Sequence, residues 1–222
     1  MKKILICGPT QCGSTRVFNL VRLLFEKNNI KVASKWIHKP SPDTPHDVLI
    51  VKCHDIVPEN LKNYECIILP LRDPRDASIS HAKRFLNENQ QTNLNCYIEF
   101  MIQYIHLYRK FKPHAGLVFK YEDYGIELIR RLADTVKVET NEAMIQDIMK
   151  ELDDLHNSKD IVKKDNHSDE NYAKTLMSQH HNTSGGQSQK YLSHFTNSQN
   201  ETILKNNFIL TFLKNNNYYN ES

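Results

Sequence analysis

The sequence lacks the marks of membrane, secreted and metal-scaffold proteins. No apolar run approaches the ~18 residues of a membrane-spanning helix, so we expect no membrane partner. The five cysteines are odd in number and have no CxxC-like spacing, which argues against a disulfide framework or a zinc site. Only four apolar residues precede Gly8-Pro9, too few for the core of a signal peptide. These absences together predict a protein of the reducing cytoplasm.

An excess of charge of one sign is also missing. The 29 basic and 26 acidic residues give a net charge of only +3, so charge makes no case for a nucleic-acid partner. A local anion site remains compatible with this balance. The length of 222 residues, with 39% hydrophobic residues, fits one packed α/β domain over residues 1–222.

Short apolar runs alternate with segments of helical periodicity along most of the chain. This alternation predicts a three-layer α/β/α fold around a central parallel sheet. The opening strand, Gly-bearing loop and helix are typical of phosphate-loop (P-loop) nucleotide-binding-like domains. The polar, histidine-rich segment 157–190 has almost no periodicity and is predicted to be mobile, and residues 215–222 form a polar tail. The predicted strands are 4–7, 48–51, 66–69 and 117–119, and the predicted helices are 14–28, 75–88, 93–112, 124–134, 141–155 and 197–214.

The loop after the first predicted strand has the composition of an anion-binding turn. Gly8 and Gly13 have the G-x4-G spacing of a phosphate loop, whose N–H groups face an anion at the start of a helix. Ser14 stands where a nucleotide triphosphatase has lysine, which argues against ATP hydrolysis or kinase chemistry. An ordinary strand–helix turn with a Ser/Thr cap fits the same residues equally well.

Cationic side chains follow two further predicted strands. Lys52 and His54 are two residues apart on a strand, so they point to the same side, and the cation favours a neutral imidazole suited to a general base. Arg72 ends the next strand, and Ser80 lies roughly two helical turns beyond it, where both can bind one phosphate. Taken singly, these clusters also fit a solvated strand end and a surface ion-pair network.

Together, these clusters resemble the sulfotransferase family, whose donor is 3′-phosphoadenosine-5′-phosphosulfate. Residues 11–15 are similar to its 5′-phosphosulfate loop, 52–54 to its Lys-Thr-His, and 72–80 to its 3′-phosphate motif. Residues 121–123 are similar to the family's Tyr-Glu-Asp, and 186–195 to its late Gly-x-x-Gly-Asp-Trp-x-x-x-Phe.

The resemblance implies transfer of a sulfuryl group to a hydroxyl or amine of a small-molecule or glycan acceptor, without a metal. It gives His54 the role of catalytic base and places Lys52 on the donor. Variable loops, here 33–47, 85–97 and 157–185, are expected to build the acceptor pocket. The implied donor-binding residues are Gln11, Cys12, Gly13, Ser14, Thr15, Arg72, Ser80, Tyr121 and Gly186.

Some positions depart from the family pattern. Gln11 replaces a basic residue of the loop, Ser184-Gly185 replaces an Arg-Lys pair that contacts the 3′-phosphate, and Tyr191 replaces tryptophan. These departures leave open a non-catalytic nucleotide-binding relative, and a magnesium-dependent, P-loop kinase-like phosphotransferase is a further alternative. The cationic residues available as substitutes are Arg16, His180, His181 and Lys190.

Overall fold

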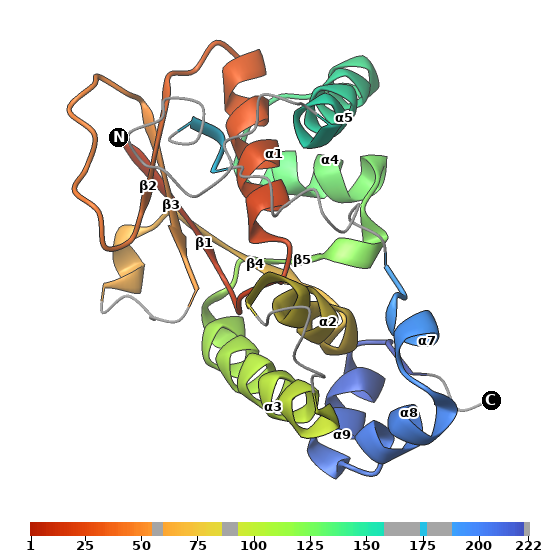
Figure 1. The fold of residues 1–222 in the computed structure, drawn as a ribbon. Helices are drawn as coiled ribbons and strands as arrows, with labels where there is room; N and C mark the ends of the chain where they lie inside the picture. The colour runs from red at the N-terminus through yellow and green to blue at the C-terminus, as the bar shows by residue number, and fades with distance from the viewer. Residues whose placement is uncertain (55–59, 86–92, 158–173, 177–187, 220–222) are drawn as a thin grey trace.

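A parallel β-sheet forms the centre of the molecule (Figure 1). The computed structural model describes residues 1–54, 60–85, 93–157, 174–176 and 188–219. Its five strands have the order β2-β3-β1-β4-β5 and are parallel to their neighbours. The strands are β1 (Lys2–Cys7), β2 (Val32–Trp36), β3 (Val48–Cys53), β4 (Cys66–Leu71) and β5 (Leu117–Lys120).

The central strands are buried on both faces, as their unbroken apolar sequences predict. Every residue of β3 and β4 is buried. In register, Cys7 at the end of β1 lies beside Cys53 at the end of β3, so the segments that follow these two strands emerge side by side. The carboxyl edge of the sheet therefore gathers the polar residues that follow its strands.

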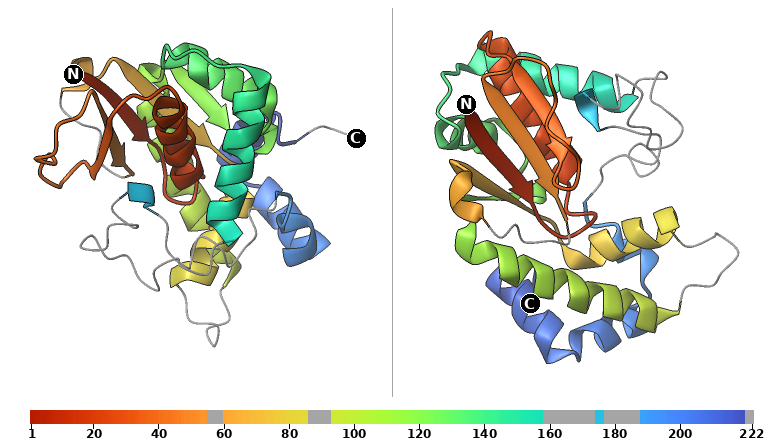
Figure 2. Two further views of the ribbon diagram at one scale, coloured as in Figure 1. Left: turned by 90° about the horizontal axis from the view of Figure 1, so that it is seen from above. Right: turned by 90° about the vertical axis from the view of Figure 1, so that its left-hand side faces the viewer.

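Helices cover both faces of the sheet, which confirms the predicted three-layer α/β architecture (Figure 2). Helices α1, α4 and α5 pack on one face, while α2, α3, α8 and α9 pack on the other. The helices are α1 (Ser14–Lys27), α2 (Pro74–Phe85), α3 (Leu94–Phe111), α4 (Ile126–Thr135), α5 (Glu142–Asn157), α7 (Tyr191–His194), α8 (Asn197–Leu204) and α9 (Asn207–Asn215), with single 3-10 turns at Leu61–Asn63, Lys112–His114 and Tyr121–Asp123. No helix in these described ranges is long and apolar enough to cross a membrane.

Two segments differ from the expectations of the sequence, and a third is described only in part. Residues 32–36, partly assigned to a loop, form edge strand β2, and the helix expected over 197–214 is two helices separated at Asn206. Most of the segment 157–190 lies outside the described residues, so its predicted mobility stays a prediction. Its described part at 174–176 contacts α1, where the Asn19 amide donates to the Thr175 carbonyl oxygen at 2.8 Å.

Candidate active site

The loop between β1 and α1 is shaped to leave the start of α1 open to an anion. Gly13 caps α1 with φ of 87° and supplies no side-chain cap, and the first turn of the helix contains no acidic residue. A Cβ atom at Gly13 would lie 2.4 Å from Cδ2 of Tyr121, so a side chain does not fit there. Backbone N–H groups and the positive end of the helix dipole are thus the main features of this turn.

The side chains of the loop divide between the core and the site. Cys12 is fully buried in the apolar core, and burial raises the pKa of its thiol to about 12. Only its backbone is therefore available to a ligand. Gln11 adopts a positive φ of 65°, and its buried Nε2 has no hydrogen-bond partner among the described residues. A buried amide donor of this kind is suited to a ligand oxygen, because an unpaired polar group is costly.

Lys52 is buried against the same loop. Its ammonium donates to the Thr15 hydroxyl oxygen at 2.7 Å and lies 4.7 Å from the centroid of a Trp36 ring. Only 2% of the residue is exposed. A buried positive charge beside the start of α1 adds to the pull of the helix end on an anion.

His54 follows β3 at the same edge, and its ring is held in one tautomer. Nδ1 lies 3.0 Å from the Gly8 carbonyl oxygen, which can only accept, so Nδ1 carries the proton and donates it. The lone pair is then on Nε2. Loss of hydration, followed by the charge of Lys52, lowers the pKa of His54 to about 3. The imidazole is therefore neutral at ordinary pH, the state that a general base needs.

Arg72 and Ser80 meet as their spacing predicts. Nη1 of Arg72 donates to the Ser80 hydroxyl oxygen at 3.2 Å, and both residues are buried. The Tyr104 hydroxyl accepts from the backbone N–H of Arg72 at 2.9 Å and lies 3.0 Å from its carbonyl oxygen. The guanidinium lies 5.0 Å from the Tyr121 ring centroid, and Gly13 approaches that ring from the loop. Tyr121 thus connects the two cationic parts of the site.

The first turn of α2 is held by carboxylates. Asp73 caps the helix by accepting from the N–H of Arg75 at 2.9 Å, and it also forms an ion pair with the Arg75 guanidinium at 2.6 Å. Ser78 donates to the carbonyl oxygen of Arg75 at 2.7 Å, so its hydroxyl serves the helix rather than the anion site. Asp73 is therefore the N-terminal cap of α2.

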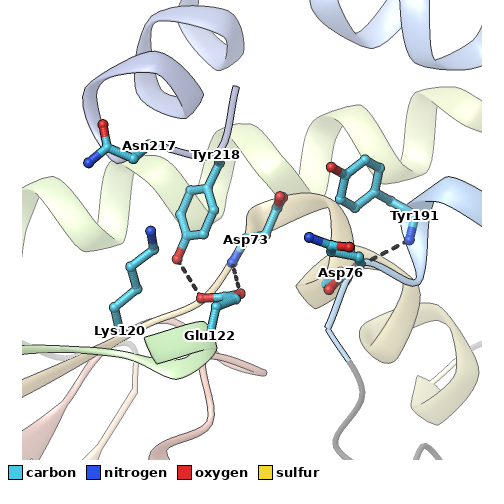
Figure 3. Close-up of a pocket in the computed structure, with 8 residues that line it drawn as sticks. Asp73, Asp76, Lys120, Glu122, Tyr191, Asn217 and Tyr218 are labelled. Carbon is cyan, nitrogen blue, oxygen red and sulfur yellow. Dashed lines mark hydrogen bonds between the residues drawn. The ribbon is translucent and has the colours of Figure 1, made fainter. Parts of the chain in front are cut away.

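A polar cavity of about 330 Å³ lies beside this turn (Figure 3). Glu122 accepts there from the N–H of Asp73 and from the Tyr218 hydroxyl, both at 2.8 Å. Asp76 accepts from the N–H of Tyr191 at 3.0 Å, and burial raises the pKa of this carboxyl. These contacts bind the C-terminal segments to the turn that follows Arg72. The cavity is lined by Asp73, Asp76, Lys120, Glu122, Gln189, Tyr191, Asn217 and Tyr218.

Most residues singled out in the sequence lie at one edge of the sheet. The loop 11–15, Lys52, His54 and the pair Arg72–Ser80 are joined by direct contacts or through Tyr121. Gly186 lies outside the described residues. Two contacts were not expected from the sequence: Trp36, whose ring lies 5.4 Å from that of His54, and Tyr104. Trp36 is the one tryptophan of the sequence, and this was the signal that could have singled it out.

The fold is similar to solved sulfotransferase structures. Mouse sulfotransferase SULT7A1 in complex with PAP matches with a TM-score of 0.68 and 13% identity, over 96% of this chain and 88% of that chain. Retinol dehydratase in complex with androsterone and inactive cofactor PAP matches with a TM-score of 0.63 and 18% identity, over 96% and 82% of the chains. The same enzyme with retinol and PAP gives a TM-score of 0.59 at 17% identity, again over 96% and 82%.

The sequence itself gives no such match. No protein-family model matches it, and no curated protein matches it. Identities of 13–18% establish a shared fold. A shared fold does not determine an activity, which depends on the residues of the site.

Proposed function

We propose that this protein is a sulfotransferase that uses 3′-phosphoadenosine-5′-phosphosulfate as donor. The observation that carries the proposal is a pair of buried cations at one edge of the sheet: Arg72 lies against the Tyr121 ring, and Lys52 contacts the loop whose Gly13 approaches the same ring. Lys52 lies at the loop and Arg72 at the end of β4. A nucleotide with phosphates at both ends of its ribose fits this arrangement better than one with a single polyphosphate chain. The shared fold with PAP-bound sulfotransferases supports the same ligand class.

The 5′ end of the donor fits the loop and the start of α1. Backbone N–H groups after Gly13 and the Lys52 ammonium provide positive charge there, and the amide of Gln11 adds a neutral donor. Ser14 and Thr15 add hydroxyl groups on the first turn. Fixed dipoles in a water-poor site stabilise developing charge without reorganisation, which is the main catalytic contribution that we assign to the loop.

His54 has the arrangement of a general base. Because Nδ1 donates to Gly8, the lone pair of Nε2 is available to take the proton of an acceptor hydroxyl. The acceptor oxygen then forms a bond to sulfur as the bond between sulfur and the bridging phosphate oxygen breaks, and adenosine 3′,5′-bisphosphate leaves. Lys52 stabilises the negative charge on the departing phosphate. The proton ends on Nε2, and the electron pair ends on the leaving phosphate.

Molecules bound in the similar structures bear on the class of acceptor. Retinol dehydratase has been solved with androsterone and with retinol, both small molecules with an oxygen function. We therefore propose a small-molecule acceptor, with a glycan as the broader alternative. The Trp36 ring beside His54 supplies an apolar surface next to the proposed base.

A thermal-shift comparison separates the candidate functions. Adenosine 3′,5′-bisphosphate at a concentration of ~100 Kd is expected to raise stability by about 2.7 kcal/mol, because a ligand of the native state shifts the unfolding equilibrium. ATP with Mg²⁺ at the same concentration is expected to raise the unfolding temperature less, because it should bind more weakly. A larger shift with ATP and Mg²⁺ would favour the phosphotransferase, and bisphosphate binding without any sulfate transfer would favour a non-catalytic relative.

Arg72→Ala tests the 3′-phosphate end of the site. Loss of a charged hydrogen bond should weaken adenosine bisphosphate binding by about 1.5–3 kcal/mol, measured by calorimetry. Arg131→Ala is the matched control, because it removes the same charge from an exposed position on α4. Equal affinities for wild type and a folded Arg72→Ala protein would contradict the assignment.

A further inference from the structure

The proposed donor site lacks two of its expected cations. Ser184-Gly185 stands where the resemblance implies an Arg-Lys pair, and both residues lie outside the described ranges. A phosphate monoester carries close to two negative charges at neutral pH, and Arg72 provides one positive charge. The structure offers a further cation nearby that comes from a different place in the sequence.

Lys190 is held against the first turns of α2 by its neighbour in sequence. The N–H of Tyr191 donates to Asp76 at 3.0 Å, and the Tyr191 ring lies 3.6 Å from the Arg75 guanidinium carbon. Both contacts fix the start of α7 beside the turn that follows Arg72. Lys190 is half-buried, at the position just before this short helix.

The charges around Lys190 are predominantly positive. Burial, followed by the charges of Arg72 and Lys83, lowers the pKa of Lys190 to about 8, while Asp76 acts in the opposite direction. Repulsion between Lys190, Arg72 and Lys83 in this half-buried position destabilises the folded protein when no ligand is bound. An anion between them removes the repulsion, so such clusters are typical of binding sites.

We propose that Lys190 binds the 3′-phosphate of the donor together with Arg72 and Ser80, in place of the basic pair missing at 184–185. This inference rests on the proposed sulfotransferase function. Among the other cations considered from the sequence, Arg16 lies 4.4 Å from the Tyr124 ring centroid and 5.2 Å from that of Tyr121. Its guanidinium therefore packs against two aromatic rings. His180 and His181 lie outside the described residues.

The assignment makes donor binding sensitive to pH in the alkaline range. The groups facing Lys190 are Arg72, Asp76 and Lys83, with Arg75 beside Tyr191. As pH rises through about 8, Lys190 of the free protein loses its proton. The phosphate binds the protonated form of Lys190, so above this pH binding requires the uptake of a proton. The affinity for adenosine 3′,5′-bisphosphate should therefore fall about tenfold between pH 7 and pH 9.

Calorimetry with two nucleotides tests the inference on the full chain. At pH 7, Lys190→Ala should weaken adenosine 3′,5′-bisphosphate binding about tenfold or more, as expected for one charged hydrogen bond. Binding of adenosine 5′-monophosphate, which lacks the 3′-phosphate, should change by less than about twofold. Lys190→Arg should keep the affinity at pH 7 and flatten its decline toward pH 9, because arginine stays charged. Lys205→Ala removes a charge from an exposed site and is the matched control.

The outcomes separate this inference from the proposed function. If Arg72→Ala weakens bisphosphate binding while Lys190→Ala binds as wild type does, the role of Lys190 is wrong and the proposed function stands. Equal losses for both nucleotides in a folded Lys190→Ala protein also overturn it. If wild type does not bind the bisphosphate, both proposals are wrong. Should Lys190→Ala fail to fold by circular dichroism, the pH profiles of wild type and Lys190→Arg decide, and identical profiles overturn the inference.

Discussion

His54 combines two contacts that give its ring a fixed protonation state. Donation from Nδ1 to Gly8 fixes the tautomer, while burial and Lys52 lower the pKa to about 3. In ¹⁵N-labelled protein, long-range ¹H–¹⁵N spectra should therefore show His54 neutral, with the proton on Nδ1, from pH 7.5 down to about pH 5. The His54→Gln spectrum identifies its signals, and exposed His38 serves as an internal control with no such burial.

The same state determines the expected kinetics. His54→Ala should reduce sulfate transfer by about 10²–10⁴-fold while leaving adenosine bisphosphate binding largely intact. Lys52→Ala should impair both, since Lys52 contacts Thr15 of the loop that we propose binds the 5′ end. A His54 ring that titrates near pH 6.5 would contradict the expected low pKa, and a His54→Ala enzyme as fast as wild type would show that His54 is not the base.

The site residues that could be predicted from the sequence are those whose position depends only on the end of a strand. Lys52, His54 and Arg72 follow parallel strands, and the carboxyl ends of such strands meet at one edge whatever the side chains do in detail. Tyr104 could not be predicted, because its contact with Arg72 joins residues 32 positions apart and nothing local marks it. The roles of these residues stay predictions until a ligand is bound.

At the scale of elements, Gly13 determines how α1 begins. An alanine there would keep a positive φ of 87° and bring Cβ to 2.4 Å from the Tyr121 ring. We expect Gly13→Ala to lower the free energy of unfolding by about 1–3 kcal/mol from backbone strain, as measured by urea denaturation. Bisphosphate affinity should fall as well, because Tyr121 must move.

Gly116→Ala is the control for this substitution. A Cβ atom at Gly116 would make only an ordinary contact, 3.7 Å from the Ile67 carbonyl oxygen. The free energy of unfolding should then change by less than about 0.5 kcal/mol, and bisphosphate binding should be unaffected. If Gly13→Ala behaves like Gly116→Ala, the loop is more adaptable than this geometry implies.

Long apolar elements were predictable, and two less regular ones were not. Strand β2 lies at the edge of the sheet and pairs only with β3, so its residues are mostly half-buried and lack a continuous apolar run. The break between α8 and α9 arises from Asn206, whose side chain accepts from the N–H groups of Phe208 and Ile209. The apolar periodicity continues across this cap, so the periodicity alone does not reveal the break. The pair Asn206-Asn207 was a signal for a helix start, because asparagine is a preferred cap residue.

At the scale of the whole molecule, the C-terminal segment helps to hold the site together. Tyr218 donates its hydroxyl proton to Glu122 at 2.8 Å, and its carbonyl oxygen accepts from Arg75 at 2.8 Å. Glu122 in turn accepts from the N–H of Asp73, next to Arg72. Part of the polar tail expected over 215–222 is therefore packed against both the turn that follows β5 and the first turn of α2.

Tyr218→Phe tests this connection. Glu122 would keep its contact with Asp73 and lose one donor, so the free energy of unfolding should fall by about 1–3 kcal/mol at pH 7. Burial raises the pKa of Glu122, and in wild type the hydrogen bond from Tyr218 partly offsets this rise. Without that hydrogen bond, the pKa of Glu122 in the folded variant should be higher than in wild type. The stability difference should therefore shrink as pH falls toward 4. Urea denaturation at pH 7, 5.5 and 4 measures it, with Tyr219→Phe as control. A difference that is the same at all three pH values would mean that Tyr218 acts through packing alone.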